Sequence, residues 1–166
     1  MCIRDIDNIV TGSYSNRDVI VDNDGGIAIL TVKRWHHCDA YGVLNGCAAL
    51  YNITTGSDAH RDAIVDNGGV MTILTGIREH HGVAAVVEYG CDALANITSG
   101  SDTRPDAIVA NGGVMTILTG IREHHGVAGV VVAGCGALWN IASGADTRRD
   151  VIVDNGGVMT ILTGIR

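Results

Sequence analysis

The sequence predicts an all-α fold built from stacked helical repeats, and two observations lead to this prediction. The first is a period of 44 residues: residues 67–110 and 111–154 are identical at 34 of 44 aligned positions, and residues 155–166 repeat 111–122 without a change. The second is that apolar residues inside each period follow helical spacing between paired glycines. A period in this range is typical of supersecondary units that bury their apolar faces by stacking on one another.

The same register extends into the diverged beginning of the chain. The segment 21–23 aligns with 65–67, and Asn8-Ile9 aligns with Asn52-Ile53. We therefore expect one array of about 3.8 repeats, which is 166 residues divided by 44. Its units are a partial repeat at 1–22, full repeats at 23–66, 67–110 and 111–154, and a partial repeat at 155–166.

A middle helix of about three turns is predicted between the glycine pair at 68–69 and Gly82. Glycine is suited to both boundaries because it allows a sharp turn without steric cost from a Cβ atom. The apolar side chains between them recur at i, i+3, i+4 and i+7, the spacing of a helix with one apolar face. These residues are Val70, Ile73, Leu74 and Ile77.

A longer helix and a short helix complete each repeat. The longer helix is expected from Val83 to about Thr98, where a polar, glycine-containing stretch ends it. The short helix is expected to begin near Thr103, with Pro105 in its first turn, where the missing N–H removes no helical hydrogen bond. The sequence thus predicts three helices per repeat.

This three-helix unit resembles the armadillo repeat. Residues 134–144, Gly-Cys-Gly-Ala-Leu-Trp-Asn-Ile-Ala-Ser-Gly, look like the third helix of that family, whose end typically reads A-L-x-N-I/L-A. Residues 149–157 are similar to the family's first helix and its glycine turn. The resemblance covers nearly the whole chain and implies an α-solenoid, a right-handed superhelix whose third helices line a concave groove. HEAT repeats are the runner-up, but they usually have two helices and no glycine pair at this place.

Composition and charge narrow the classes of function. With 46% apolar residues, 23 glycines and a single proline, the chain is interpreted as an ordered array dense in turns. A formal net charge of -7 argues against a broad phosphate-binding surface, so nucleic acid is not an expected partner. The start of the chain is charged where a signal peptide is apolar, and no apolar stretch approaches about 18 residues. We expect a soluble cytoplasmic protein, with the nucleus as the alternative location and no membrane partner.

The long helix carries one face that is free to vary. Between the two closest repeats, five pairs of differing positions occupy one stripe roughly 120° wide, and Thr98/Ala142 is the remaining change near the end of the helix; the apolar residues outside this stripe are kept or nearly so. The resemblance implies that this free face lines the groove. The pairs are Ala85/Gly129, Glu88/Val132, Tyr89/Ala133, Asp92/Gly136 and Ala95/Trp139.

An asparagine near the middle of this stripe does not vary, since it recurs as Asn8, Asn52, Asn96 and Asn140. The resemblance implies that these asparagines hold the backbone of an extended peptide, and a carboxamide can do so because it both donates and accepts. The other interpretation is that each asparagine tethers the turn of an adjacent repeat.

The candidate binding surface is therefore a set of aromatic, acidic and amide side chains on the long helices. Such a set suggests a partner protein or extended peptide with some basic or apolar side chains. The alternative is that Tyr51 and Trp139 pack on the neighbouring repeat. The residues are Tyr41, Leu44, Asn45, Tyr51, Asn52, Glu88, Tyr89, Asp92, Asn96, Val132, Trp139 and Asn140, together with Asn8.

One departure from the family limits what the resemblance implies. Nuclear-import adaptors pair this asparagine with a tryptophan four residues earlier, but the residues there are Ala48, Asp92 and Gly136. Trp139 instead directly precedes Asn140. A receptor for nuclear-localisation signals is therefore disfavoured.

Catalysis and metal binding have little support in the sequence. Histidine pairs recur at 36–37, 80–81 and 124–125, but no carboxylate or cysteine accompanies them in every repeat, so a zinc site is not expected. The glycine-rich turns match neither of the nucleotide-binding patterns G-x-x-x-x-G-K-[ST] and G-x-G-x-x-G. No nucleophile, base and orienting acid form a recognisable catalytic set. We expect no enzyme activity, no metal and no cofactor.

The cysteines are interpreted as buried thiols. Cys47, Cys91 and Cys135 recur at one spacing, and stacked repeats would hold their Cα atoms beyond the roughly 7 Å limit for a disulfide.

A second function class stays open beside partner binding. No polar capping repeat is visible at either end, so the chain could be a structural array that self-assembles, or part of a longer one.

Overall fold

The computed structural model describes residues 39–164, and all regular secondary structure in this range is helical. The all-α fold class predicted from the sequence is therefore confirmed for these residues. Asn8 and the partial repeat at 1–22 lie outside the described range. The helices are α4 Ala40–Thr54, α5 Asp58–Asp66, α6 Gly69–Glu79, α7 Ala84–Thr98, α8 Arg104–Ala110, α9 Gly113–Glu123, α10 Ala128–Ala142, α11 Asp146–Asp154 and α12 Gly157–Gly164.

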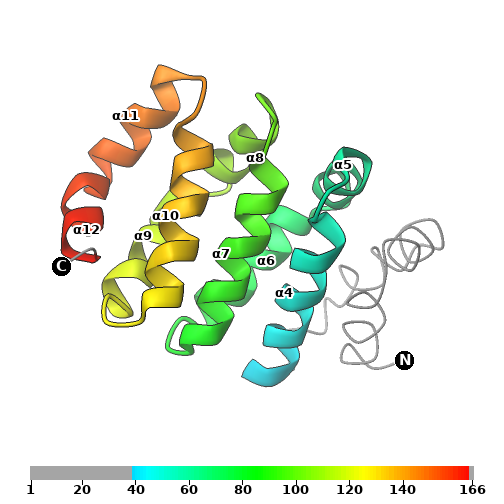
Figure 1. The fold of residues 1–166 in the computed structure, drawn as a ribbon, viewed down its shortest axis with the longest axis horizontal. Coiled ribbons are helices and arrows are strands. Elements are labelled where there is room, and N and C mark those ends of the chain that lie inside the picture. The colour runs from blue at the N-terminus through cyan, green and yellow to red at the C-terminus, as the bar shows by residue number, and fades with distance from the viewer. Residues whose placement is uncertain (1–38, 165–166) are drawn as a thin grey trace.

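The helices recur in space as they do in sequence. Helices α4, α7 and α10 begin at residues 40, 84 and 128, which are 44 apart, and they lie side by side as one layer (Figure 1). Helices α6 and α9 lie behind them, α12 packs against α9 at the end of this second layer, and the short helices α5, α8 and α11 follow one edge (Figure 1). Each long helix thus packs sideways on the long helices of the neighbouring repeats and, behind, on the middle helices. The side that points away from the middle helices is left uncovered.

Glycine and proline mark the helix boundaries for steric reasons. Gly68 has a φ of +79°, a left-handed conformation that glycine adopts without strain, and α6 begins at the next residue. Gly69 is also required, because a Cβ atom there would collide with Ile64. Pro105 lies in the first turn of α8, as predicted, and α7 begins one residue after the expected Val83.

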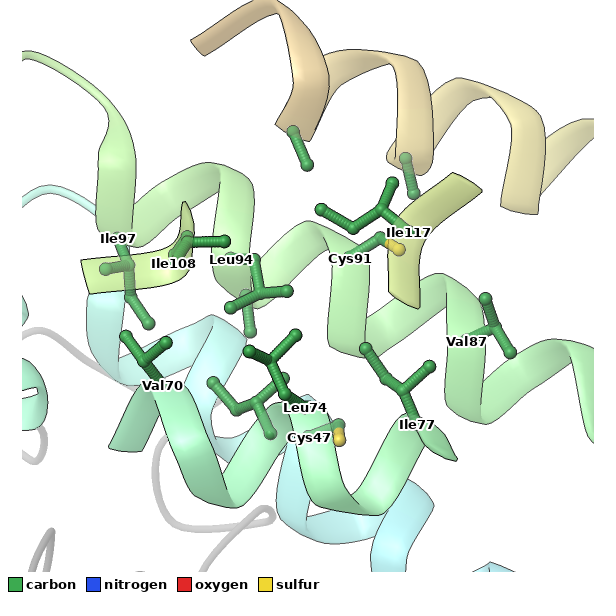
Figure 2. Close-up of a cluster of buried hydrophobic side chains, with 14 of the residues drawn as sticks. Cys47, Val70, Leu74, Ile77, Val87, Cys91, Leu94, Ile97, Ile108 and Ile117 are labelled. Carbon is green, nitrogen blue, oxygen red and sulfur yellow. The ribbon is translucent and has the colours of Figure 1, made fainter. Parts of the chain in front are cut away.

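The core lies between the layer of long helices and the layer of middle helices. Its side chains are almost completely buried, and Figure 2 shows how those of α6 face those of α7 across the interface. Leu94, with an exposed fraction of 0%, lies near the centre of this cluster. The labelled members are Cys47, Val70, Leu74, Ile77, Val87, Cys91, Leu94, Ile97, Ile108 and Ile117.

The two layers approach each other closely at glycines that recur at the same position of the repeat. A Cβ atom on Gly134 of α10 would lie 2.7 Å from Cγ1 and 2.8 Å from Cδ1 of Ile121 in α9. Gly90 of α7 faces Ile77 of α6 in the same way, with both of these distances at 2.7 Å. The absence of a side chain at these positions lets a long helix sit directly on the isoleucines beneath it.

None of the helices in the described part of the chain is long and apolar enough to cross a membrane.

Candidate partner-binding surface

The surface in question is the outward side of α4, α7 and α10, which we call the long-helix face. Every residue of the candidate set within the described range is at least partly exposed there. Positions at the margin, such as Ala48 and Ala133, are buried at 9% and 4% exposure. The long-helix face comprises Tyr41, Leu44, Asn45, Tyr51, Asn52, Glu88, Tyr89, Asp92, Asn96, Val132, Trp139 and Asn140.

Large side chains project from this face with unusual exposure. Trp139 is 77% exposed and Val132 is 72% exposed, both on α10. Tyr41 on α4 is 56% exposed and Tyr89 on α7 is 38% exposed. Aromatic side chains that stay in water offer a large contact area to a partner at low conformational-entropy cost.

One of the aromatic pairs joins neighbouring repeats. The rings of Tyr51 on α4 and Tyr89 on α7 meet edge to face, with centroids 6.4 Å apart and an interplanar angle of 74°. Tyr51 therefore does pack on the next repeat, as the alternative interpretation of the sequence required. Trp139 holds the equivalent position on α10, which is the last long helix in the described residues, and it is 77% exposed there.

Two acidic side chains give the face its charge. Glu88 and Asp92 are one turn apart on α7, and the Glu88 carboxylate lies over Gly129 of α10, where a Cβ atom would collide with it. Partial burial, and then the negative charge of Glu88, raise the pKa of Asp92 above its usual value. On the neighbouring helix, no heavy atom lies within 4 Å of the place where a Cβ atom of Gly136 would sit. The acids thus border an open stretch of α10.

The repeated asparagine tethers neighbouring long helices. Asn96 Nδ2 donates to the main-chain oxygen of Tyr51 at 3.1 Å and to Thr55 Oγ1 at 3.2 Å. Asn140 Nδ2 donates to the main-chain oxygen of Ala95 at 2.8 Å. Both acceptor carbonyls lie in the last turn of a helix, where the oxygen of Tyr51 also accepts from Thr54 Oγ1 and that of Ala95 also accepts from Thr98 Oγ1. The amide donor of each asparagine is therefore committed to the preceding repeat.

These hydrogen bonds limit the contacts that the two asparagines can make with a partner. Nδ2 of Asn96 has two acceptor oxygens on the side of the neighbouring helix, so the carboxamide is oriented with Nδ2 toward that helix. Among the described residues, no hydrogen bond is assigned to Oδ1 of Asn96 or Asn140. The resemblance implied that each carboxamide both donates to and accepts from a peptide, whereas in this geometry only Oδ1 is left, as an acceptor. Both side chains are also partly buried rather than freely exposed.

Buried arginines form a second tether, which was not predicted from the sequence. Arg104, 6% exposed, donates from Nη1 to Asp62 and from Nη2 to Asp58, both at 2.7 Å, so α8 is held against α5. Its hydrogen bond, followed by that of Arg61, lowers the pKa of Asp58. Arg148, one period later, donates to the main-chain oxygens of Ser143 at 2.8 Å and Asp102 at 3.1 Å. The sequence signal for these contacts is that the arginine recurs after 44 residues, as Arg104 and Arg148.

A third set of tethers lies in the layer of middle helices. Arg78 donates from Nε to Thr116 Oγ1 at 2.9 Å and from Nη2 to the main-chain oxygen of Asn111 at 2.7 Å, and Arg122 repeats both contacts one period later. Beside each arginine is a hollow between successive middle helices, of about 310 Å³ and about 440 Å³. The first is lined by Ile77, Arg78, His81, Met115, Thr116, Thr119 and Glu123.

The histidine pairs take part in contacts between repeats. His81 Nδ1 and Glu123 Oε2 are 2.7 Å apart, and His124 Nε2 donates to the main-chain oxygen of His81 at 2.7 Å. Within residues 39–164, no three His, Cys, Asp or Glu side chains are grouped so that they could hold a metal ion.

Comparisons with known proteins bear on the fold alone. No family model matches the sequence, and no curated protein matches it. Among solved structures, the chain is similar to an engineered protein whose crystal structure comes from the Northeast Structural Genomics Consortium, with a TM-score of 0.82 and 34% identity over 95% of this chain and 62% of that one. A second engineered protein from the same consortium aligns with a TM-score of 0.64 and 28% identity over 93% of this chain and 46% of that one.

The chain thus spans less than two thirds of either engineered protein. The similarity supports the all-helical, repeat-like arrangement and carries no information about a ligand. Any function must therefore be inferred from the long-helix face itself, with its exposed aromatic rings, its two acids and its oriented carboxamides.

Proposed function

We propose that the chain is an armadillo-like solenoid whose long-helix face binds an extended segment of a partner protein. In this proposal about 3.8 repeats of three helices form a right-handed superhelix, and α4, α7 and α10 line its concave groove. The proposal draws on the sequence resemblance, on the recurrence of the helices every 44 residues and on the likeness to the two engineered proteins. The protein acts by binding, without catalysis or a cofactor, in the cytoplasm or the nucleus.

The observation that carries the proposal is the row of exposed large side chains on one face. Trp139, Val132, Tyr41 and Tyr89 come from three neighbouring helices and are between 38% and 77% exposed. Aromatic residues supply a large part of the binding energy at protein interfaces, because they bury much surface with few rotatable bonds. A face that collects them in water is suited to a protein partner rather than to a small molecule.

The charge of the face supports a basic and apolar partner. Partial burial raises the pKa of Asp92, and the negative charge of the nearby Glu88 raises it further. A cationic side chain placed between them would relieve this repulsion and would favour the ionised form of Asp92. We therefore propose a lysine or arginine opposite Glu88 and Asp92, and apolar side chains opposite Val132 and Trp139.

The asparagines have a narrower role in this proposal than the resemblance implied. Nδ2 of Asn96 and Asn140 binds the preceding helix, which fixes the orientation of each carboxamide. Oδ1 is then available to accept a hydrogen bond from a main-chain N–H of the partner. Since the carboxamide is already held in place, little side-chain entropy is lost when the partner binds.

An array of short synthetic peptides tests the proposal. The array should vary lysine, arginine and apolar residues independently, and the probes are the full chain, the double variant Tyr89→Ala/Trp139→Ala, and the control Met115→Ala. Met115 is 44% exposed on α9, in the other layer. The proposal expects basic, apolar peptides to be retained by the full chain and the control, and to be lost by the double variant. Equal retention by all proteins would show that binding occurs elsewhere.

A further inference from the structure

Two arginines in the layer of middle helices carry a positive charge that no acid of the described residues neutralises. Arg78 on α6 and Arg122 on α9 form no ion pair within residues 39–164. Each guanidinium is nevertheless held in place, because it donates to a threonine hydroxyl and to a main-chain oxygen. The other arginines of this range all contact an aspartate, at distances between 2.7 and 3.5 Å; they are Arg61, Arg104, Arg148 and Arg149.

Arg78 keeps donors that its contacts do not use. A guanidinium donates from Nε and from both terminal nitrogens. Arg78 uses Nε to bind Thr116 and Nη2 to bind the main-chain oxygen of Asn111, while no acceptor among the described residues is assigned to Nη1. Thr116 is 7% exposed, so a buried hydroxyl orients a guanidinium that is itself exposed. The result is a fixed cationic donor that is accessible to a ligand.

The hollow of about 310 Å³ between α6 and α9 lies beside this donor. Its apolar lining comes from Ile77, which is 1% exposed, and from Met115, which is 44% exposed, with Thr119 one turn beyond Met115. Sites for small molecules are typically concave and mostly apolar, with volumes of about 300 to 1,000 Å³ and a few polar groups that orient the ligand. The hollow has this character, with Arg78 as the orienting group.

Charged groups stand at both ends of the hollow. The guanidinium of Arg78 is held by Thr116, near the start of α9, whereas Glu123 is the last residue of that helix and lies 2.7 Å from His81 Nδ1. Thr116 and Glu123 are seven residues apart in one helix, which places them about 10 Å apart along its axis. An anion bound at Arg78 is therefore kept away from the carboxylate of Glu123.

We propose that this hollow binds a small molecule with a carboxylate at one end and an apolar chain about 10 Å long. The carboxylate accepts from Nη1 of Arg78, and such a charge-assisted hydrogen bond is stronger than one between neutral groups. The chain covers Ile77 and Met115, and the removal of apolar surface from water favours binding. A small molecule fits better than an extended protein segment, because the contact of His81 with Glu123 bridges the end of α6 to α9 at one end of the hollow.

The arrangement recurs one period later. Arg122 makes the same two contacts beside a second hollow, of about 440 Å³, which Met159 and Thr163 line. We therefore expect a second site of the same kind between α9 and α12. Both hollows lie in the layer of middle helices, away from the long-helix face (Figure 1). The inference thus goes beyond the proposed partner binding, and either can fail without the other.

Methyl nuclear magnetic resonance spectra of the full chain, titrated with octanoate, test the proposal. Octanoate should shift the methyl signals of Met115 and Met159 in a saturable way and should leave the indole signal of Trp139 unchanged. Arg78→Gln should weaken the binding reported by Met115 by about tenfold or more, because it removes the cation that binds the carboxylate. The matched control is Arg149→Gln, which removes an exposed arginine from α11 and should bind octanoate normally.

Two further probes separate the role of the carboxylate from that of the apolar chain. Octanol has the chain without the charge and acetate has the charge without the chain, so each should bind about tenfold more weakly than octanoate, or worse. Thr119→Phe should fill the first hollow while the contacts of Arg78 stay intact, and it decides the matter if circular dichroism shows that Arg78→Gln is unfolded. No saturable shift of Met115, equal binding of octanol and octanoate, or unchanged binding by folded Arg78→Gln or Thr119→Phe would overturn the proposal.

Discussion

The side-chain amide of Asn140 donates a hydrogen bond of 2.8 Å to the main-chain oxygen of Ala95, and the amide of Asn96 donates one of 3.1 Å to the main-chain oxygen of Tyr51. The two contacts are equivalent, since Tyr51 and Ala95 are 44 residues apart. In these two repeats, one asparagine thus joins its helix to the end of the preceding long helix. This contact gives a physical reason why Asn96 and Asn140 are the same residue while their neighbours on the face vary.

Replacing this asparagine should weaken the fold. Asn140→Ala removes a partly buried hydrogen bond, while the oxygen of Ala95 keeps the donors Ser99 N and Thr98 Oγ1, so we expect a loss of about 0.5 to 1.5 kcal/mol in the free energy of unfolding. Leu94→Ala should cost more, about 2 to 5 kcal/mol, because it opens a cavity in the core. Urea denaturation measures both. Asn45→Ala, on the same face of α4, is the control, and an Asn140→Ala protein as stable as this control would contradict the tether.

Much of the helical pattern was predictable from the sequence because local signals determine it. The glycine pair at 68–69 and the apolar spacing after it predicted α6, and Pro105 predicted the start of α8 within a residue or so. The role of Asn96 could not be decided in this way. Its acceptor, the oxygen of Tyr51, lies 45 residues earlier, and their proximity depends on how neighbouring long helices pack.

The arginine tethers were missed for the same reason. Arg104 reaches Asp58 and Asp62 of the preceding repeat, and these contacts depend on the distance between two short helices. Nothing in the local sequence distinguishes such an arginine from a solvated one, although its recurrence as Arg148 was visible. The exposure of Val132, Trp139 and Tyr89 was easier to foresee, because variation between copies marked the side of the helix that the core does not use.

Two glycines of α10 should respond in opposite ways to the same substitution. Gly134→Ala places a Cβ atom within 2.7 Å of Ile121, so the two layers must separate locally and we expect a loss of about 1 to 3 kcal/mol. Gly136→Ala meets nothing within 4 Å and should stabilise the helix by about 0.5 to 1 kcal/mol. Thermal unfolding followed by circular dichroism compares the two. Similar effects with the same sign would show that α10 does not sit on α9 as described.

The raised pKa of Asp92 predicts how stability depends on pH. A carboxyl with a raised pKa in the folded state contributes stability that is present below its unfolded pKa and is lost as the pH rises through its folded pKa. Asp92→Asn removes the cost of burying a charge beside Glu88, so this variant should be more stable than the parent at neutral pH and similar to it in acid. Urea denaturation at both pH values measures the difference. The prediction fails if the variant is less stable at neutral pH.

Asp92→Asn, which should stabilise the fold at neutral pH, should weaken the binding of a partner. If a lysine or arginine of the partner lies between Glu88 and Asp92, Asp92→Asn weakens the affinity for a basic, apolar peptide while stabilising the free protein. A variant that gains stability and loses affinity would identify Asp92 as a residue kept for binding. Titration calorimetry at low and high salt provides this comparison, and the weakening should be smaller at high salt because screening reduces the charge interaction.

The most direct test of the central proposal is to locate a bound peptide by nuclear magnetic resonance. A basic, apolar peptide retained by the array should be added to the isotope-labelled chain, with the indole signal of Trp139 assigned from a Trp139→Phe variant. The proposal predicts that this indole and the main-chain amides of Tyr89 and Asp92 shift on binding, whereas those of Met115 and Thr119, which line the hollow between α6 and α9, do not. Shifts concentrated at Met115 and Thr119, with Trp139 unchanged, would contradict it.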